Sequence, residues 1–247
     1  MNMPPDILHV FAAFARSDVK CLLMGGQACV QYGAAEFSKD IDFAILCDDA
    51  NLAALARTLR ELHATLIAVP PFDRRHLEIG QALHFRCCDG PAKGMRIDVM
   101  SRMRGVAPFP DLWERRTTVT LHDGICIEVL GLRDLVQAKK TQRDKDWPMI
   151  ARLVEVHYLN HREESTLAQR EFWFRELRNA GLLSTLAAEF ADEAAALAPE
   201  RPAIAAALMQ QDIAQSLRDE EERERAADRA YWEPLKKQLE ELRRRKA

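Results

Sequence analysis

The sequence is poor in aromatic residues, which make up 7% of its 247 positions, so aliphatic side chains and alanine must fill most of any core. Hydrophobic residues still reach 48%, enough to bury a sizeable core. The chain also lacks an excess of positive charge, because 35 Lys and Arg stand against 38 Asp and Glu and give a formal net charge of -3. Affinity for nucleic-acid phosphates needs clustered Lys and Arg. Composition therefore gives no global case for nucleic-acid binding, although a local basic groove stays open.

Further absences bear on compartment and chemistry. No basic segment followed by an apolar one opens the chain, and no apolar run approaches a bilayer span, so we expect neither a signal peptide nor a membrane helix. The six cysteines form no C-x-x-C pair, which argues against a zinc site. We expect reduced thiols in a cytoplasmic protein. The chain also lacks a G-x-S-x-G nucleophile elbow and a P-loop.

Hydrophobic patterning divides the chain into an α/β half and a helical half. Short apolar runs bounded by turn residues predict strands, and amphipathic stretches predict helices. The predicted strands cover 19–24, 40–47, 66–70, 82–88, 95–101, 117–122 and 125–130. Turn residues at Asp89-Gly90-Pro91 and at Asp123-Gly124 predict that the last four strands form two hairpins. The predicted helices of this half cover 4–16 and 49–63, with another opening at 27–32. From residue 131 helical patterns dominate, at 131–141, 146–159, 163–180, 184–197 and 201–245. We therefore predict an α+β fold with a mixed sheet, followed by an all-helical C-terminal region.

The last predicted helix is dense in charge. Residues 218–246 are rich in Arg and Glu around one narrow apolar stripe, and Pro234 is expected to kink or split the helix. A solvated helix of alternating charges accounts for this composition. The basic end, Arg243-Arg244-Arg245-Lys246, leaves open a contact with a partner or with nucleic acid.

The residues that point to chemistry follow the first predicted strand. That strand ends at Gly25-Gly26, and glycine lets the backbone approach a ligand closely. The N–H groups at the start of the following helix suit a phosphate. The next strand opens with Asp40-Ile41-Asp42, where alternation puts both carboxylates on one face and Ile41 toward the core. Two carboxylates on one face repel each other unless a cation neutralises them, and hard carboxylate oxygens favour magnesium.

A third carboxylate, Asp98, lies in a later predicted strand between Ile97 and Val99. Its apolar neighbours indicate that the strand is buried, so the acid needs a reason to be there. If this strand lies beside the one that carries Asp40 and Asp42, three acids come together. Such a group could hold two magnesium ions for in-line phosphoryl transfer.

These segments, Gly25-Gly26, Ser38-Lys39-Asp40-Ile41-Asp42 and Ile97-Asp98-Val99, together resemble the DNA polymerase β-like nucleotidyltransferase superfamily. The resemblance implies a polymerase-β-like nucleotidyltransferase core in which Gly25, Gly26 and Ser38 contact the nucleotide. It also implies that the three acids are the catalytic residues and bind magnesium. The chain departs from the family's pattern at Glu36-Phe37, where many relatives carry an Arg.

A second similarity covers residues 131–153, GLRDLVQAKKTQRDKDWPMIARL. This stretch looks like the Lys-containing helix and Lys-Asp motif of the bacterial toxin-like branch, which includes abortive-infection nucleotidyltransferase toxins. It implies that Lys139 or Lys140, together with Lys145 and Asp146, lies near the nucleotide. A lysine can act as a point charge on the β and γ phosphates. We favour Lys139, which follows Leu135 by four residues on the inward stripe of its helix. Asp146 could orient a lysine or cap the next helix.

The expected protein is a magnesium-dependent nucleotidyltransferase with a core at 1–130, a helical completion of the nucleotide site at 131–160, and a helical C-terminal region at 161–247. It would move a nucleoside monophosphate from a nucleoside triphosphate to a hydroxyl of RNA, a protein or a small molecule, and the toxin-like resemblance favours RNA or protein. The alternative is a catalytically silent relative that acts as a binding protein in a toxin–antitoxin pair. The C-terminal helices would shape acceptor binding, or mediate self-association or contact with a cognate partner.

Overall fold

The computed structural model describes residues 3–35, 38–121 and 124–246. The chain forms two compact units. The first comprises Met1–Gln31, Ala35–Ala138 and Tyr231–Ala247, and the second comprises Tyr32–Ala34 and Lys139–Ala230. The long helix α12 (Ile213–Lys246) contributes residues to both. Within the described ranges, every helix is too short or too polar to cross a bilayer.

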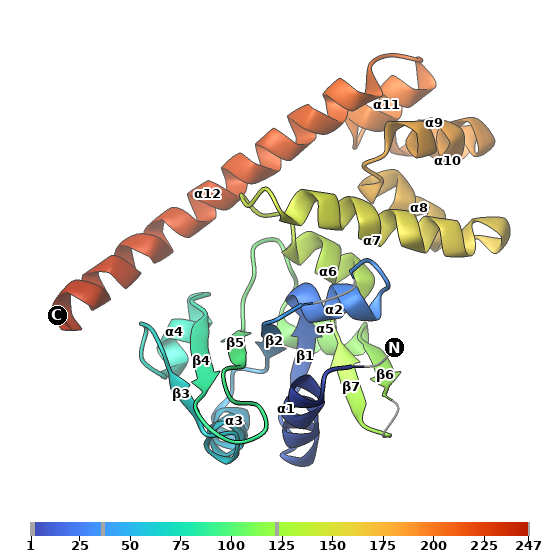
Figure 1. Cartoon of the computed structure of the whole chain (residues 1–247). Coiled ribbons are helices and arrows are strands. Elements are labelled where there is room, and N and C mark those ends of the chain that lie inside the picture. The colour runs from blue at the N-terminus through green and yellow to red at the C-terminus, as the bar shows by residue number, and fades with distance from the viewer. Residues whose placement is uncertain (1–2, 36–37, 122–123, 247) are drawn as a thin grey trace. The chain divides into compact units, whose positions relative to one another are not determined.

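The first unit is built on a mixed sheet whose seven described strands lie in the order β3-β4-β5-β2-β1-β7-β6 (Figure 1). The strands are β1 (Cys21–Met24), β2 (Ile41–Ile45), β3 (Ala64–Leu66), β4 (Leu83–Cys87), β5 (Arg96–Met100), β6 (Thr117–Thr120) and β7 (Cys126–Val129). Strand β2 runs antiparallel to β1 and parallel to β5, and β1 runs parallel to β7. The remaining neighbours are antiparallel. The predicted α+β class with a mixed sheet is confirmed.

Both predicted hairpins are present. Strands β4 and β5 pair through Leu83 and Val99, and β6 and β7 pair through Thr117 and Val129. The predicted turn residue Asp123 lies outside the described residues. Strand β3 ends at Leu66, whereas the sequence predicted a strand at 66–70. Pro70 has no N–H to donate to a ladder, so pairing does not extend to it.

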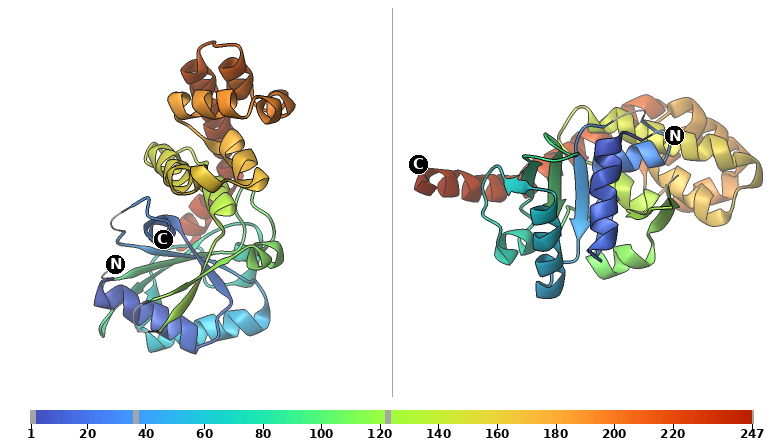
Figure 2. Two further views of the ribbon diagram at one scale, coloured as in Figure 1. Left: turned by 90° about the vertical axis from the view of Figure 1, so that its right-hand side faces the viewer. Right: turned by 60° about the horizontal axis from the view of Figure 1, so that its bottom comes forward.

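Two helices, α1 (Pro5–Arg16) and α3 (Asp49–Glu61), cover the same face of this sheet (Figure 1, Figure 2). Phe14 of α1 stacks on Phe43 of β2 with ring centroids 4.3 Å apart, and Phe11 meets the same ring edge-on at 6.3 Å. Side chains alternate along a strand, so Asp42, the neighbour of Phe43, points to the opposite face. The face without α1 and α3 is therefore the one that carries the acids.

The shorter helices among the described residues of the first unit are α2 (Gly25–Gln31), α4 (Arg74–Glu78), α5 (Phe109–Glu114) and α6 (Leu132–Ala138). The sequence predicted neither α4 nor α5, because five or six residues give too little periodicity. Each nevertheless carries a local start signal. The Asp73 carboxylate accepts the N–H of Arg75 at 2.9 Å, and Pro108 precedes α5.

The second unit is helical, as the sequence predicted. Its described helices before α12 are α7 (Asp146–His161), the 3-10 helix η1 (Arg162–Glu164), α8 (Leu167–Glu176), α9 (Ala180–Glu189), α10 (Ala191–Leu197) and α11 (Pro202–Leu208). The single helix predicted at 201–245 is wrong in extent. Helix α11 ends at Leu208 and α12 begins at Ile213, and Gln210 between them takes a positive φ of 54°. The expected split at Pro234 is also wrong, because Pro234 lies inside the continuous α12.

A buried ion cluster joins several helices of this unit. Glu220 of α12 accepts hydrogen bonds from Arg178 at 2.9 Å and from Arg201 at 2.8 Å. The three side chains are 16%, 7% and 7% exposed, respectively. Burial alone opposes ionisation of Glu220, but the two guanidinium charges outweigh it and hold the pKa of its carboxyl below the ordinary value.

Replacement of Glu220 tests this cluster. We expect Glu220→Gln to lower the free energy of unfolding by about 3 kcal/mol at pH 7, because two buried guanidinium groups lose their carboxylate. A depressed pKa stabilises the fold above the unfolded-state value, and this contribution is lost as the pH falls through the folded-state pKa. Urea denaturation from pH 7 downward should therefore show the difference shrinking below about pH 4.5.

The matched control is Glu164→Gln at an exposed glutamate of the same unit, which should change stability little. A loss for Glu220→Gln that is constant with pH, or no larger than that of the control, would contradict the ion-cluster account.

Candidate active site

The parallel pairing of β2 with β5 brings two of the predicted acids side by side. Asp42 is the register partner of Asp98, one residue after the paired Ile41 and Ile97. Both isoleucines are fully buried. The two acids therefore share the face opposite the core. Asp40 comes directly before β2, and alternation places it with Asp42. The expected adjacency of these strands is confirmed.

Asp98 is held by two basic side chains that the sequence did not single out. Arg96 donates from Nε to Asp98 Oδ1 at 2.8 Å, and His84 Nδ1 lies 2.9 Å from the same oxygen. Arg96 Nη2 also lies 3.1 Å from His84 Nδ1. One ring nitrogen cannot serve both contacts at once, because it donates to Asp98 when protonated and accepts from Arg96 when not. The cluster thus has two alternative hydrogen-bond patterns.

These partners set the charge of Asp98. Its side chain is only 16% exposed, and burial by itself would favour the neutral acid. The hydrogen bonds and charges of His84 and Arg96 outweigh burial, so the pKa of Asp98 lies below its ordinary value. In turn, the hydrogen bond to Asp98 raises the pKa of the Arg96 guanidinium, against a smaller opposing effect of burial. The charges of Asp40 and Asp42 also contribute to that increase.

The donor chemistry of the three acids fits magnesium, because carboxylate oxygens are its preferred protein ligands. The acids are not yet grouped for it. Among the described residues, no set of three or more His, Cys, Asp or Glu side chains is placed to hold one metal ion. Asp98 instead meets Arg96 and His84. Asp40 and Asp42 from β2 and Asp98 from β5 would hold the ion, and their side chains would have to turn toward it.

The two glycines are required by what lies against them. Gly25 takes a positive φ of 66°, and a Cβ there would lie 1.9 Å from Asp42 Oδ2. A Cβ on Gly26 would lie 2.4 Å from Ser38 Oγ. The buried amide of Gln27 donates to the Ser38 carbonyl at 2.7 Å and fixes that segment. The Gly25-Gly26 pair thus lets Asp42 and Ser38 approach the start of α2, and Gln27 is a positioning residue that the sequence did not reveal.

The remaining predicted residues, Lys139, Lys145 and Asp146, belong to the second unit. Lys139 is 8% exposed, and its Nζ lies 3.4 Å from Asp146 Oδ1. Asp146 also accepts from Thr141 at 2.6 Å and from Arg143 at 2.8 Å. Burial opposes its ionisation, but these partners hold its pKa below the ordinary value, with the Lys139 charge contributing most. Asp146 therefore orients a lysine, one of the two roles considered.

Lys140 and Lys145 differ from Lys139. The Lys140 ammonium pairs with Glu176 of α8 at 2.9 Å. Lys145 is exposed at the start of α7. The prediction that Lys139 lies on the helix is wrong, because α6 ends at Ala138, and the ammonium groups of Lys139 and Lys140 just beyond it have different partners. Glu36 and Phe37, the departure from the family's pattern, lie outside the described residues.

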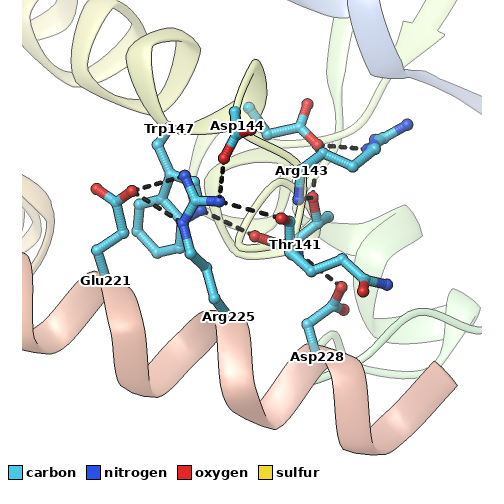
Figure 3. Close-up of polar contacts among 9 residues, drawn as sticks. Thr141, Arg143, Asp144, Trp147, Glu221, Arg225 and Asp228 are labelled. Carbon is cyan, nitrogen blue, oxygen red and sulfur yellow. Dashed lines mark hydrogen bonds and ion pairs between the residues drawn. The ribbon is translucent and has the colours of Figure 1, made fainter. Parts of the chain in front are cut away.

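Side chains of α12, more than 80 positions further along the sequence, make hydrogen bonds to the segment 139–146 (Figure 3). The buried carboxylate of Asp228 accepts the N–H of Gln142 at 2.8 Å. Arg225 donates to the Gln142 carbonyl at 3.0 Å and to Asp144 at 2.6 Å. The indole N–H of Trp147 donates to the Thr141 carbonyl at 2.8 Å. This segment is therefore a fixed turn.

Comparison with known proteins finds likeness of structure alone. The chain matches no protein-family model and no curated protein. It is similar to a candidate nucleotidyltransferase from H. pylori, with a TM-score of 0.40 and 13% identity over 88% of this chain and 94% of that one. It is also similar to JHP933 from Helicobacter pylori, with a TM-score of 0.39 and 12% identity over 98% and 95% of the two chains. Likeness at this level carries no assignment, so the functional argument rests on the site.

The close contact of Gly25 with Asp42 can be tested by Gly25→Ala. The left-handed backbone costs an alanine about 1 kcal/mol, and the collision with the Asp42 carboxylate adds to that. We expect the free energy of unfolding, from urea titration, to fall by clearly more than this amount.

Gly94→Ala is the matched control for that change. Gly94 has a comparable φ of 88°, but a Cβ there would meet no described atom within 4 Å. Equal losses at the two positions would show that Asp42 does not pack against Gly25.

Proposed function

We propose that this chain is a magnesium-dependent nucleotidyltransferase, which moves a nucleoside monophosphate from a nucleoside triphosphate to an acceptor hydroxyl. The observation that carries the proposal is the register of Asp42 with Asp98, with Gly25 packed against the Asp42 carboxylate. Acids on neighbouring strands beside a glycine turn suit a metal-bound triphosphate.

Each residue has a role in this proposal. Asp40 and Asp42 would hold magnesium, and Asp98 would complete a ligand set for two ions. Bound magnesium supplies charge neutralisation and polarises the phosphate that reacts. Gly25, Gly26 and Ser38 contact the phosphates. Phosphate binding by Lys139 and Lys145, with Asp146 beside Lys139, stays a prediction from the sequence.

The reaction is an in-line displacement at the α-phosphorus. The acceptor oxygen forms a new P–O bond as the bond from the α-phosphorus to the bridging oxygen breaks, and pyrophosphate leaves with that electron pair. The hydroxyl proton passes to the Asp98 carboxylate and then to solvent. Asp98 can take this proton because a carboxylate is ionised at neutral pH. Catalysis on this account is chiefly positioning and charge neutralisation.

The Asp40→Asn/Asp42→Asn double variant tests the assignment. Transfer of label from α-labelled nucleoside triphosphates to acceptors in cell extract should fall at least about 100-fold, because the phosphate charge is no longer neutralised. Thermal unfolding should show an intact fold. Asp89→Asn, at an exposed turn of the same unit, is the control and should keep full transfer. Full transfer in the double variant would rule out these acids as the site.

Two observations favour a second candidate, a catalytically silent nucleotidyltransferase-like binding protein of a toxin–antitoxin type system. Asp98 is neutralised by Arg96, and the acids are not grouped around a metal position. A thermal-shift screen of nucleoside triphosphates with and without magnesium separates the two. A magnesium-dependent shift without label transfer to any extract component supports the silent protein, and a shift with transfer supports the enzyme.

A further inference from the structure

The acid face of the sheet already contains a cation of its own. Arg96 and Asp98 are two residues apart on β5, so their side chains share a face. Arg96 comes one residue before Ile97, the register partner of Ile41, just as Asp40 comes one residue before Ile41. Arg96 therefore lies on the strand beside the one that follows Asp40, and its guanidinium group donates a hydrogen bond to Asp98. Its charge is felt by all three acids.

Arg96 and Asp98 do not form a bidentate contact, in which two parallel hydrogen bonds join a guanidinium group to both carboxylate oxygens. Arg96 uses Nε on Asp98 Oδ1, while its Nη2 lies near His84. The Arg96 side chain is also 36% exposed, so it can turn into solvent.

The second unit offers a contrast. Arg201 is 7% exposed, reaches Glu220 from both Nε and Nη2, and also donates to the carbonyls of Phe174 and Leu177. That arginine is fixed in place by burial and by four hydrogen bonds to protein groups, whereas Arg96 is fixed chiefly by one carboxylate oxygen.

We propose that Arg96 is a positioning residue that substitutes for the metal. It neutralises Asp40, Asp42 and Asp98 while the site is empty of divalent ions, and it releases Asp98 when such an ion binds. This inference rests on the proposed function. It concerns exchange of a guanidinium for a divalent cation at the same carboxylates, with no covalent change. The arrangement explains why three like charges can share one face in the absence of metal.

The first test of this exchange uses no metal. Thermal unfolding is measured for the wild type, Arg96→Met, Asp98→Asn and the double variant. Arg96→Met should lower the unfolding temperature, because Asp98 loses its guanidinium partner. The same change should have a much smaller effect in the Asp98→Asn background. Arg86→Met is the control, since Arg86 is exposed and is the register partner of Arg96 on β4. Independent, additive effects at 96 and 98 would overturn the inference.

The second test titrates magnesium alone and follows the unfolding temperature. Arg96→Met should respond at a magnesium concentration about tenfold lower than the wild type, because the competing positive charge is gone. Arg96→Lys keeps the charge and should stay near the wild type. A merely structural arginine would leave the concentration dependence unchanged in all three.

The outcomes separate this inference from the proposed function. A magnesium response at the same concentration in the wild type and Arg96→Met overturns the inference alone. Weaker magnesium binding in Arg96→Met also overturns it, since Arg96 would then assist the ion. The absence of any magnesium response in the wild type and all variants overturns both the metal-dependent function and the exchange.

Discussion

The proposed site depends on one pairing, the parallel register that sets Asp42 of β2 beside Asp98 of β5. Neighbouring strands lie about 4.8 Å apart, so two carboxylates on one face cannot both stay ionised in a partly buried place without nearby positive charge. In this structure Arg96 supplies that charge at Asp98, and His84 contacts the same carboxylate oxygen. The same carboxylates would bind magnesium in the proposed enzyme. Positive charge on this face is therefore a requirement of the fold itself, and a catalytic ion would meet it in a different way.

Because side chains alternate along each strand, one face of the sheet carries the apolar core and the other carries the acids. Phe43, Ile97 and Val99 point to the buried face, where Phe43 packs against α1. Their neighbours Asp42 and Asp98 necessarily point to the other face. The turn at Gly25 then brings backbone against Asp42 with no side chain between them. The packed apolar face thus fixes the strand backbone, and the backbone places Asp42 and Asp98.

Much of this site followed from the sequence, because alternation along a strand is a local rule. It placed Ile41 in the core and the acids on one face, and the apolar neighbours of Asp98 indicated a buried strand. No local pattern singles out Arg96 and His84, because their role depends on which strands are adjacent. Arg225 and Asp228 reach Gln142 from far along the chain and read in the sequence as ordinary helix charges. Helices α4 and α5 were missed because each spans too few residues to show a period.

Electron paramagnetic resonance of Mn²⁺, which reports the unbound ion, measures directly whether these carboxylates bind a divalent ion together with a triphosphate. We expect the wild type to bind Mn²⁺, and we expect a nucleoside triphosphate to tighten the binding. We also expect Asp42→Asn and Asp98→Asn each to weaken the binding about tenfold or more, since each removes a charged ligand. Binding that is equally tight in the wild type and both variants would contradict the account.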